Sequence, residues 1–133
     1  MNDSGRQGPK PGKVLQNFRF ALDGLKHAIA TERHMKIHIG SALAVLALAI
    51  VFKVSKFEFL FLLTAIMLVI IAELINTAVE RAADLAHPDF HPLSKAAKDV
   101  AAGAVLAAAV FAVIVGVAVF WEPLKRFFAT ILD

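Results

Sequence analysis

The chain of 133 residues contains no cysteine, which excludes disulfide bridges, thiolate metal sites and cysteine nucleophiles. It also has no Gly-x-x-x-x-Gly-Lys loop and no His-Arg-Asp motif, so it is neither a P-loop enzyme nor a protein-kinase fold. Charge is locally scarce, since residues 59–72 carry none. The chain instead has 59% hydrophobic residues and a mean hydropathy of +0.70, which is too apolar for a soluble domain of this size.

The N-terminal region is polar. Residues 1–12 are rich in glycine, proline and polar residues and predict a disordered cytoplasmic tail. We expect no cleavable signal peptide, because the first apolar run begins late and lacks a small-residue cleavage site. Apolar residues then recur at helical spacing, which predicts an amphipathic helix along the cytoplasmic interface, although a soluble core helix would look the same. These residues are Val14, Phe18, Leu22, Leu25 and Ile29.

Three apolar segments predict membrane-spanning helices at about residues 37–54, 57–85 and 95–121. Between the last two, we expect a short loop, with Ser94 as the N-cap of the third helix. The final residues, 122–133, should form an outer-side tail. The sequence therefore predicts an all-α membrane protein with a single embedded domain over residues 13–121.

The positive charges predict the orientation of this domain. Three spans place the two chain ends on opposite sides, with ten of the fourteen Lys and Arg residues on the N-terminal side and four on the other. Because positive residues favour the cytoplasmic side, the N-terminus should lie inside and the C-terminus outside. These charges adjoin hydrocarbon-length segments, so they indicate a membrane surface and no nucleic-acid partner.

The third span carries small residues at four-residue spacing. Such a ridge lets helices approach closely, although alanine is common throughout this chain. Three thin helices cannot enclose a site by themselves, so we expect an oligomer. The ridge consists of Ala104, Ala108, Ala112 and Gly116.

A polar stripe follows one face of the second span towards its end. At 100° per residue its members share one narrow face. Acidic groups in or beside a bilayer are costly unless they bind something, so the stripe predicts a site; the alternative is a charged helix end that meets water. The stripe consists of Glu73, Asn76, Thr77, Glu80 and Asp84.

Other charged residues should converge on the same side of the membrane. Carboxylates around a hard cation, with an ammonium for phosphate, are what magnesium-assisted phosphoryl transfer needs. A deeper, less solvated carboxylate suits general-base work, and Glu73 is the deepest. The converging residues are Glu32, before the first span, the stripe residues Glu73, Asn76 and Glu80, and Lys98 with Asp99 at the start of the third.

This pattern closely resembles the prokaryotic diacylglycerol kinase and undecaprenol kinase family of small integral-membrane lipid kinases. The resemblance extends from residue 14 to about residue 120. The combination of Glu-x-x-Asn-Thr-x-x-Glu with a downstream Ala-Lys-Asp is highly specific, whereas any one piece alone is weak. The matching residues are Phe20-Ala21, Gly24-Leu25, Glu32, Ile37-His38, Glu73-Leu74-Ile75-Asn76-Thr77-Ala78-Val79-Glu80, Asp84, His91-Pro92, Lys95 and Lys98-Asp99-Val100-Ala101-Ala102-Gly103-Ala104-Val105-Leu106.

The resemblance implies a role for each site residue. Glu73 would be the general base that accepts the proton of the lipid hydroxyl. Glu32 and Glu80 would hold Mg²⁺ with the ATP phosphates, and Asn76 and Lys98 would position the γ-phosphate. Asp99 would orient Lys98 or the nucleotide, and Asp84 would join the nucleotide-binding residues. It also implies a homotrimer with shared active sites in the bacterial inner membrane.

The resemblance constrains the identity of the lipid substrate less than it constrains the site residues. The loop from Asp89 to Lys95 and the Ala101–Leu106 run resemble the undecaprenol kinase branch, which we favour over a diacylglycerol kinase. His34 departs from relatives that often carry Asn there, which affects local nucleotide contacts. A hypothesis from another class is a non-enzymatic small membrane subunit, which would have no reason to keep Glu73, Glu80, Lys98 and Asp99 together.

Overall fold

A computed structural model describes residues 11–132, which form four helices. The predicted all-α fold is confirmed, and so are three helices long and apolar enough to cross a membrane. The tail predicted over residues 1–12 lies mostly outside the described residues, and its last two residues begin the first helix. The helices are α1 (Pro11–Thr31), α2 (Arg33–Val51), α3 (Lys56–Ala86) and α4 (Pro92–Leu132).

The three apolar helices differ in length. Helices α2, α3 and α4 contain 19, 31 and 41 residues, or about 28, 46 and 62 Å at 1.5 Å per residue. A bilayer hydrocarbon core is about 30 Å thick. Helix α2 therefore just matches such a core, whereas α3 and α4 extend beyond it.

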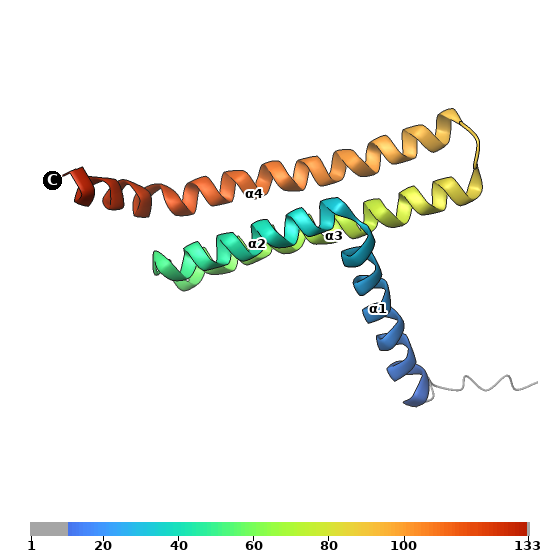
Figure 1. The fold of residues 1–133 in the computed structure, drawn as a ribbon, viewed down its shortest axis with the longest axis horizontal. Helices are drawn as coiled ribbons and strands as arrows, with labels where there is room; N and C mark the ends of the chain where they lie inside the picture. Colours follow the sequence, from blue (N-terminus) through green and yellow to red (C-terminus); the bar gives the residue numbers. More distant parts are fainter. Residues whose placement is uncertain (1–10, 133) are drawn as a thin grey trace, which may run out of the picture.

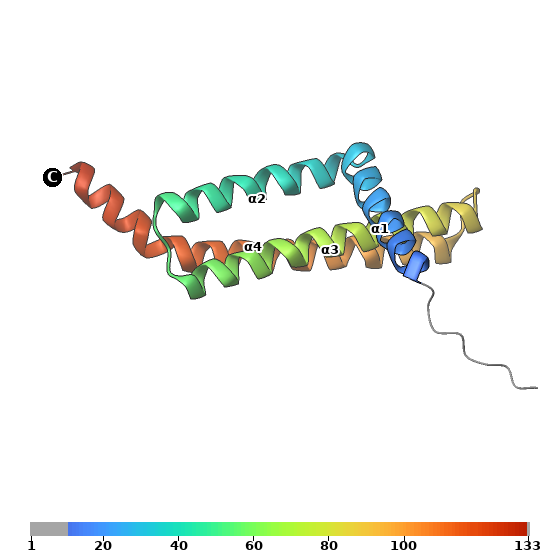
Figure 2. The same cartoon turned by 90° about the horizontal axis from the view of Figure 1, so that it is seen from below.

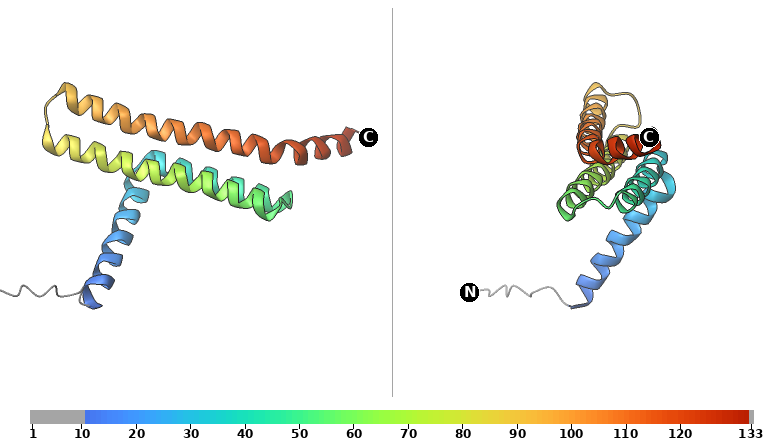
Figure 3. Two further views of the ribbon diagram at one scale, coloured as in Figure 1. Left: turned by 180° about the vertical axis from the view of Figure 1, so that it is seen from behind. Right: turned by 90° about the vertical axis from the view of Figure 1, so that its left-hand side faces the viewer.

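Helices α3 and α4 run antiparallel and side by side, and α2 packs against α3 (Figures 1 and 3). Helix α1 projects from the bundle at a steep angle, near the end where α3 leads into α4 (Figures 1 and 2). We call this end the charged end, because the α1–α2 joint at Glu32 and the residue 87–91 connection both lie there. It is the end that positions the candidate site.

The buried core is small and lies towards the opposite end. Its main cluster consists of Ala49, Leu62, Val119 and Phe120, with the Phe52 ring 6.1 Å from that of Phe120. Many large apolar side chains are exposed instead, including Ile50, Phe61 and Val113. Burial of apolar area is the main favourable term in folding. A surface with this much uncovered apolar area needs lipid or other subunits around it.

The turn between α2 and α3 is closed by hydrogen bonds at both helix ends. The N–H groups of Lys53 and Val54 donate to the carbonyls of Ile50 and Ala49, and Lys53 has a left-handed φ of 52°. This is the Schellman arrangement, here without its usual glycine. Ser55 Oγ then accepts from the Glu58 N–H, while the Ser55 N–H donates to Glu58 Oε2. This turn ends α2 at Val51, three residues before the predicted end of the first span.

The N-cap of α4 differs from the prediction. Ser94 lies inside the helix, and its hydroxyl donates to the Ala83 carbonyl of α3. His91 takes the capping position, because its Nδ1 accepts from the Leu93 N–H and its carbonyl accepts from the Lys95 N–H. Pro92 then occupies the first helical position, where the missing N–H costs nothing. The prediction of Ser94 was wrong because a cross-helix partner was available to its hydroxyl.

The chain after Trp121 is helical as far as Leu132, where the sequence predicted a tail. Pro123 lies inside this helix, and proline removes one backbone hydrogen bond and bends a helix. The last turns of α4 veer from the axis of the preceding part (Figure 2). The Phe127 ring packs edge-on against Phe52 at 6.2 Å, which fixes the direction of this segment.

The small-residue ridge of α4 serves packing within the protomer. Ala112 and Gly116 line a groove with residues of α2 and α3, and Ala104 and Ala108 line another with α3. All but Ala104 are half-buried. The ridge therefore does not by itself mark an interface between subunits.

Candidate active site

The first three residues of the polar stripe lie on the packed face of α3, whereas Glu80 is half-buried and Asp84 is exposed. Glu73, Asn76 and Thr77 are buried, with 5%, 9% and 7% of their surface exposed. They continue the row of buried apolar residues Ala65 and Val69 on the same helix. A carboxylate in such a place is costly to keep charged unless it has partners or a ligand. The stripe is therefore a built polar site.

Asn76 links two successive turns of α3 within this stripe. Its Nδ2 donates to Glu80 Oε1 at 3.0 Å, one helical turn away. Its Oδ1 is buried and, within residues 11–132, accepts no hydrogen bond. A buried acceptor without a donor costs about 1–3 kcal/mol, so this atom is a natural place for a ligand's donor.

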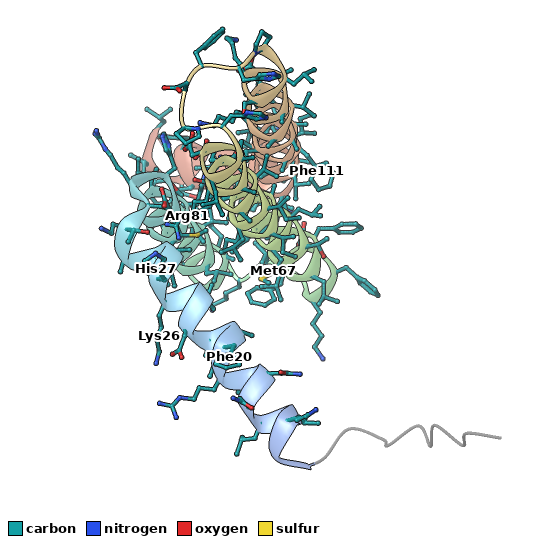
Figure 4. All side chains as sticks on the ribbon, turned by 90° about the vertical axis from the view of Figure 1, so that its right-hand side faces the viewer. Phe20, Lys26, His27, Met67, Arg81 and Phe111 are labelled. Carbon is teal, nitrogen blue, oxygen red and sulfur yellow. The ribbon has the colours of Figure 1, made fainter. Side chains whose placement is uncertain are left out.

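Glu32 is held against α3 by Arg81, which lies 49 positions further along the chain. It is the N-cap of α2 in extended conformation, but its side chain makes no capping bond. Arg81 Nη2 instead donates to Glu32 Oε1 at 2.7 Å and to Thr31 Oγ1 at 3.0 Å. Thr31 Oγ1 also lies 3.2 Å from Glu32 Oε1. Figure 4 shows Arg81 near the α1–α2 joint and His27.

The contact with Arg81 favours the ionised form of the Glu32 carboxyl. The hydrogen bond from Arg81 lowers the pKa of the Glu32 carboxyl, desolvation opposes the shift, and Thr31 adds to it. Glu32 is thus an anion at neutral pH. From the sequence, Arg81 is predicted only to be one of the positive charges on the N-terminal side of the membrane. No local signal could have paired it with a residue 49 positions away.

Lys98 and Asp99 do not pair with each other. Lys98 Nζ donates to Asp84 across the α3–α4 pair, and Lys95 Nζ donates to Asp99 one turn along α4. Asp84, Lys95 and Lys98 line a cavity of about 380 Å³ beneath the α3–α4 connection, whereas Asp99 lies outside its lining. The stacked rings of His87 and His91, with centroids 4.3 Å apart, form another part of its wall. The cavity lining combines carboxylates with the ammonium groups of Lys95 and Lys98, and ammonium groups can bind phosphate.

A second cavity is apolar. A groove of about 340 Å³ lies between α2, α3 and α4, lined by residues such as Val45, Val69 and Ala112. Its few polar lining residues, His38 and Ser41, belong to the first turns of α2, nearer the charged end. Val69 lies one helical turn from Glu73 on the packed face of α3. The groove therefore leads towards the buried carboxylate.

The carboxylates near the charged end include candidate ligands for Mg²⁺. Within residues 11–132, no three His, Asp or Glu side chains are grouped as a ready metal cage. Mg²⁺ in phosphate-transferring sites commonly takes one or two carboxylates and completes its shell with phosphates and waters. Glu32 and Glu80 are the two carboxylates that could supply such ligands, because Glu32 pairs with Arg81, the residue that follows Glu80 on α3. Carboxylate oxygens are the ligand type that Mg²⁺ prefers, so the chemistry of these two donors suits the ion.

These features define a class of protein. Three helices of membrane-crossing length line an apolar groove, and charged residues at one end of the bundle line a polar cavity. Such an arrangement suits a membrane protein that binds an apolar ligand in the groove and a polar ligand at the charged end.

Comparison with known proteins assigns the family. Residues 19–120 match the family described as prokaryotic diacylglycerol kinase. A diacylglycerol kinase of Synechocystis sp. is 42% identical over 112 residues, which are 84% of this chain and 64% of the relative. The undecaprenol kinase of Bacillus subtilis is 37% identical over 112 residues, 84% of this chain and 91% of the relative. The diacylglycerol kinase of Escherichia coli K12 is 28% identical over 110 residues, covering 83% and 90%.

The chain belongs to the prokaryotic diacylglycerol kinase family. The predicted resemblance is thereby confirmed, and with it membership in a family of lipid kinases, enzymes that phosphorylate a lipid alcohol. The hypothesis of a non-enzymatic membrane subunit is set aside by the same match.

Proposed function

We propose that this protein phosphorylates a membrane lipid alcohol with ATP and Mg²⁺, with undecaprenol as the favoured substrate and diacylglycerol as the alternative. The observation that carries the proposal is the position of Glu73. It is 5% exposed and lies one turn beyond Val69 of the apolar groove, so a lipid chain in the groove would present its hydroxyl there.

The chemistry follows from the residues at the charged end. Glu73 accepts the proton of the lipid hydroxyl, whose oxygen attacks the γ-phosphorus of ATP. A new O–P bond forms, the bond between the γ-phosphorus and its bridging oxygen breaks, and ADP leaves. Mg²⁺ held by Glu32 and Glu80 would neutralise charge on the phosphates.

The remaining site residues position the nucleotide. Asn76 and Lys98 contact the γ-phosphate, with the free Asn76 Oδ1 available to a donor on the bound ligands. Lys98 pairs with Asp84, and Lys95 pairs with Asp99. Both pairs are at least partly exposed, so exchanging one partner for a phosphate costs little. Asp84 and Asp99 then orient the nucleotide.

The preference for undecaprenol rests on similarity. The Bacillus subtilis undecaprenol kinase aligns with 91% of its length, and the Asp89–Lys95 loop and Ala101–Leu106 run resemble that branch. The Synechocystis diacylglycerol kinase has the higher identity, 42%, over 64% of its length. Detergent-solubilised protein should be offered both lipids separately with MgATP. Faster turnover of undecaprenol supports the preference, faster turnover of diacylglycerol reverses it, and transfer to neither lipid contradicts the lipid kinase proposal.

We further propose a membrane arrangement for the chain. The charged end faces the cytoplasm of a bacterium, in the inner membrane, where ATP is available, and the C-terminus lies outside. Helix α1 lies along the cytoplasmic interface, with its exposed Val14, Phe18 and Leu22 in the lipid. Three copies assemble, which covers exposed apolar surface, and they share active sites.

A further inference from the structure

The contact between Arg81 and Glu32 has a specific geometry. The guanidinium group uses one nitrogen, Nη2, to reach both Thr31 Oγ1 and Glu32 Oε1. The Thr31 hydroxyl lies within hydrogen-bonding distance of the same carboxylate oxygen and of the His27 carbonyl. Within residues 11–132, every hydrogen bond to this carboxylate thus reaches Oε1, and Oε2 has no partner.

The contact also has a specific place in the fold. Thr31 is the last residue of α1 and Glu32 caps α2, so Arg81 ties the joint between two helices to a third. Arg81 directly follows Glu80, whose Oε1 is held by Asn76. Glu32 and Glu80 come from distant parts of the chain. Each carboxylate is held through one oxygen by a residue of α3, Glu32 by Arg81 and Glu80 by Asn76.

We propose that Arg81 is a positioning residue that orients Glu32 for Mg²⁺, fixing Oε1 and leaving Oε2 available to bind the cation. This inference rests on the proposed function, in which Glu32 is a ligand. Carboxylates that bind metals are generally hydrogen-bonded by outer groups, and removal of such a group typically costs 10–100-fold in metal affinity or activity. Arginine suits the role because it stays charged and its planar donors have fixed directions.

If Arg81 acted only by stabilising the fold, its replacement would lower the thermal stability of the protein. The Arg81 and Glu32 side chains are 46% and 29% exposed, and ion pairs of this kind contribute little to folding. Replacing Arg81 should therefore leave the thermal denaturation of the protein nearly unchanged. The effect should appear in metal binding instead.

The test is Mn²⁺ binding to the full-length protein in detergent with ADP, followed by the electron paramagnetic resonance signal of free Mn²⁺. Arg81→Met removes every donor and keeps the length of the side chain. Its apparent Kd for Mn²⁺ should rise about tenfold or more, with Arg81→Lys in between. The matched control is Arg33→Met at the same joint, because Arg33 has no ion pair within the described residues; its Kd should match wild type.

A second measurement separates Arg81 acting through Glu32 from Arg81 contacting the nucleotide. In a Glu32→Gln background, Arg81→Met should cause no further loss of Mn²⁺ affinity. An equal further loss would overturn the inference, as would unchanged Mn²⁺ affinity in Arg81→Met. If the wild-type protein itself binds no Mn²⁺ with ADP, the proposed metal site falls and this inference falls with it.

Discussion

At the scale of single residues, the site combines carboxylates in three different environments. Glu73 is buried, Glu80 accepts a hydrogen bond from Asn76, and Glu32 pairs with Arg81. Environment determines what a carboxylate can do, because a desolvated group favours proton transfer and a solvated one favours a cation. We therefore expect substitutions of the three to have different kinetic effects.

Replacement of Glu73 by glutamine tests the base. The amide keeps the shape of the side chain but cannot accept the hydroxyl proton. Turnover of the lipid should fall on the order of 10²-fold or more, with little change in the KM for ATP. Circular dichroism and gel filtration should show wild-type folding. Near-normal turnover of folded Glu73→Gln protein would remove the base assignment.

Replacement of Glu80 by alanine tests the metal ligand. Apparent affinities for Mg²⁺ and ATP should weaken together, since the ion bridges protein and phosphates. Initial rates measured over a matrix of Mg²⁺ and ATP concentrations report both. Glu122→Ala, which breaks an exposed pair with Lys125 at the opposite end, is the control and should change neither. A Mg²⁺ dependence identical to wild type in Glu80→Ala would contradict the role.

At the scale of helices, the ends and joints determine where the site residues lie. Helix α3 is long enough to hold the apolar groove along one part and the stripe along another. The α2–α3 turn fixes how α2 lies against it, through a left-handed Lys53 and a capping box at Ser55. The α1–α2 joint is a single extended residue, Glu32, which sets the steep angle of α1 and presents the carboxylate to Arg81.

The capping box provides an element-scale prediction. Ser55→Ala removes the side-chain acceptor for the Glu58 N–H and should destabilise the folded protein by about 1 kcal/mol. Denaturation midpoints in detergent measure this effect. Thr64→Ala is the control, because its hydroxyl donates only to the Leu60 carbonyl within α3, and it should change stability by less than about 0.5 kcal/mol. Equal midpoints for the two variants would show that the box does not stabilise this turn. Kinase turnover should be unchanged in both.

At the scale of the whole molecule, one protomer leaves much apolar surface uncovered and a site that is open. Only α3 and α4 pack along most of their length, whereas α2 covers a part of α3 (Figures 1 and 2). Glu73 and Glu80 lie seven positions apart on one helix, about 10 Å along its axis. In the proposed trimer, neighbouring copies would cover this surface and supply further residues around the open site.

Mixed oligomers test this proposal. The protein in detergent should have the mass of a trimer. Glu73→Gln and Glu32→Ala proteins should each be inactive, and co-assembled mixtures should recover a sizeable fraction of wild-type turnover if one copy supplies the base and another the metal site. Differential tags confirm mixing. Confirmed mixed oligomers without recovery would show that each copy builds its own site.

The sequence by itself determined the helical fold, the three apolar segments, the polar stripe and the family, because hydropathy and helical spacing are local properties of the chain. The position of α3 at Lys56–Ala86 is close to the predicted 57–85 for this reason. The pairing of Arg81 with Glu32, of Lys98 with Asp84, and of Ser94 with α3 depends on which helix faces meet. The helical path beyond Pro123 depends on the contact of Phe127 with Phe52. Only the tertiary structure decided these, since each joins residues that no local pattern connects.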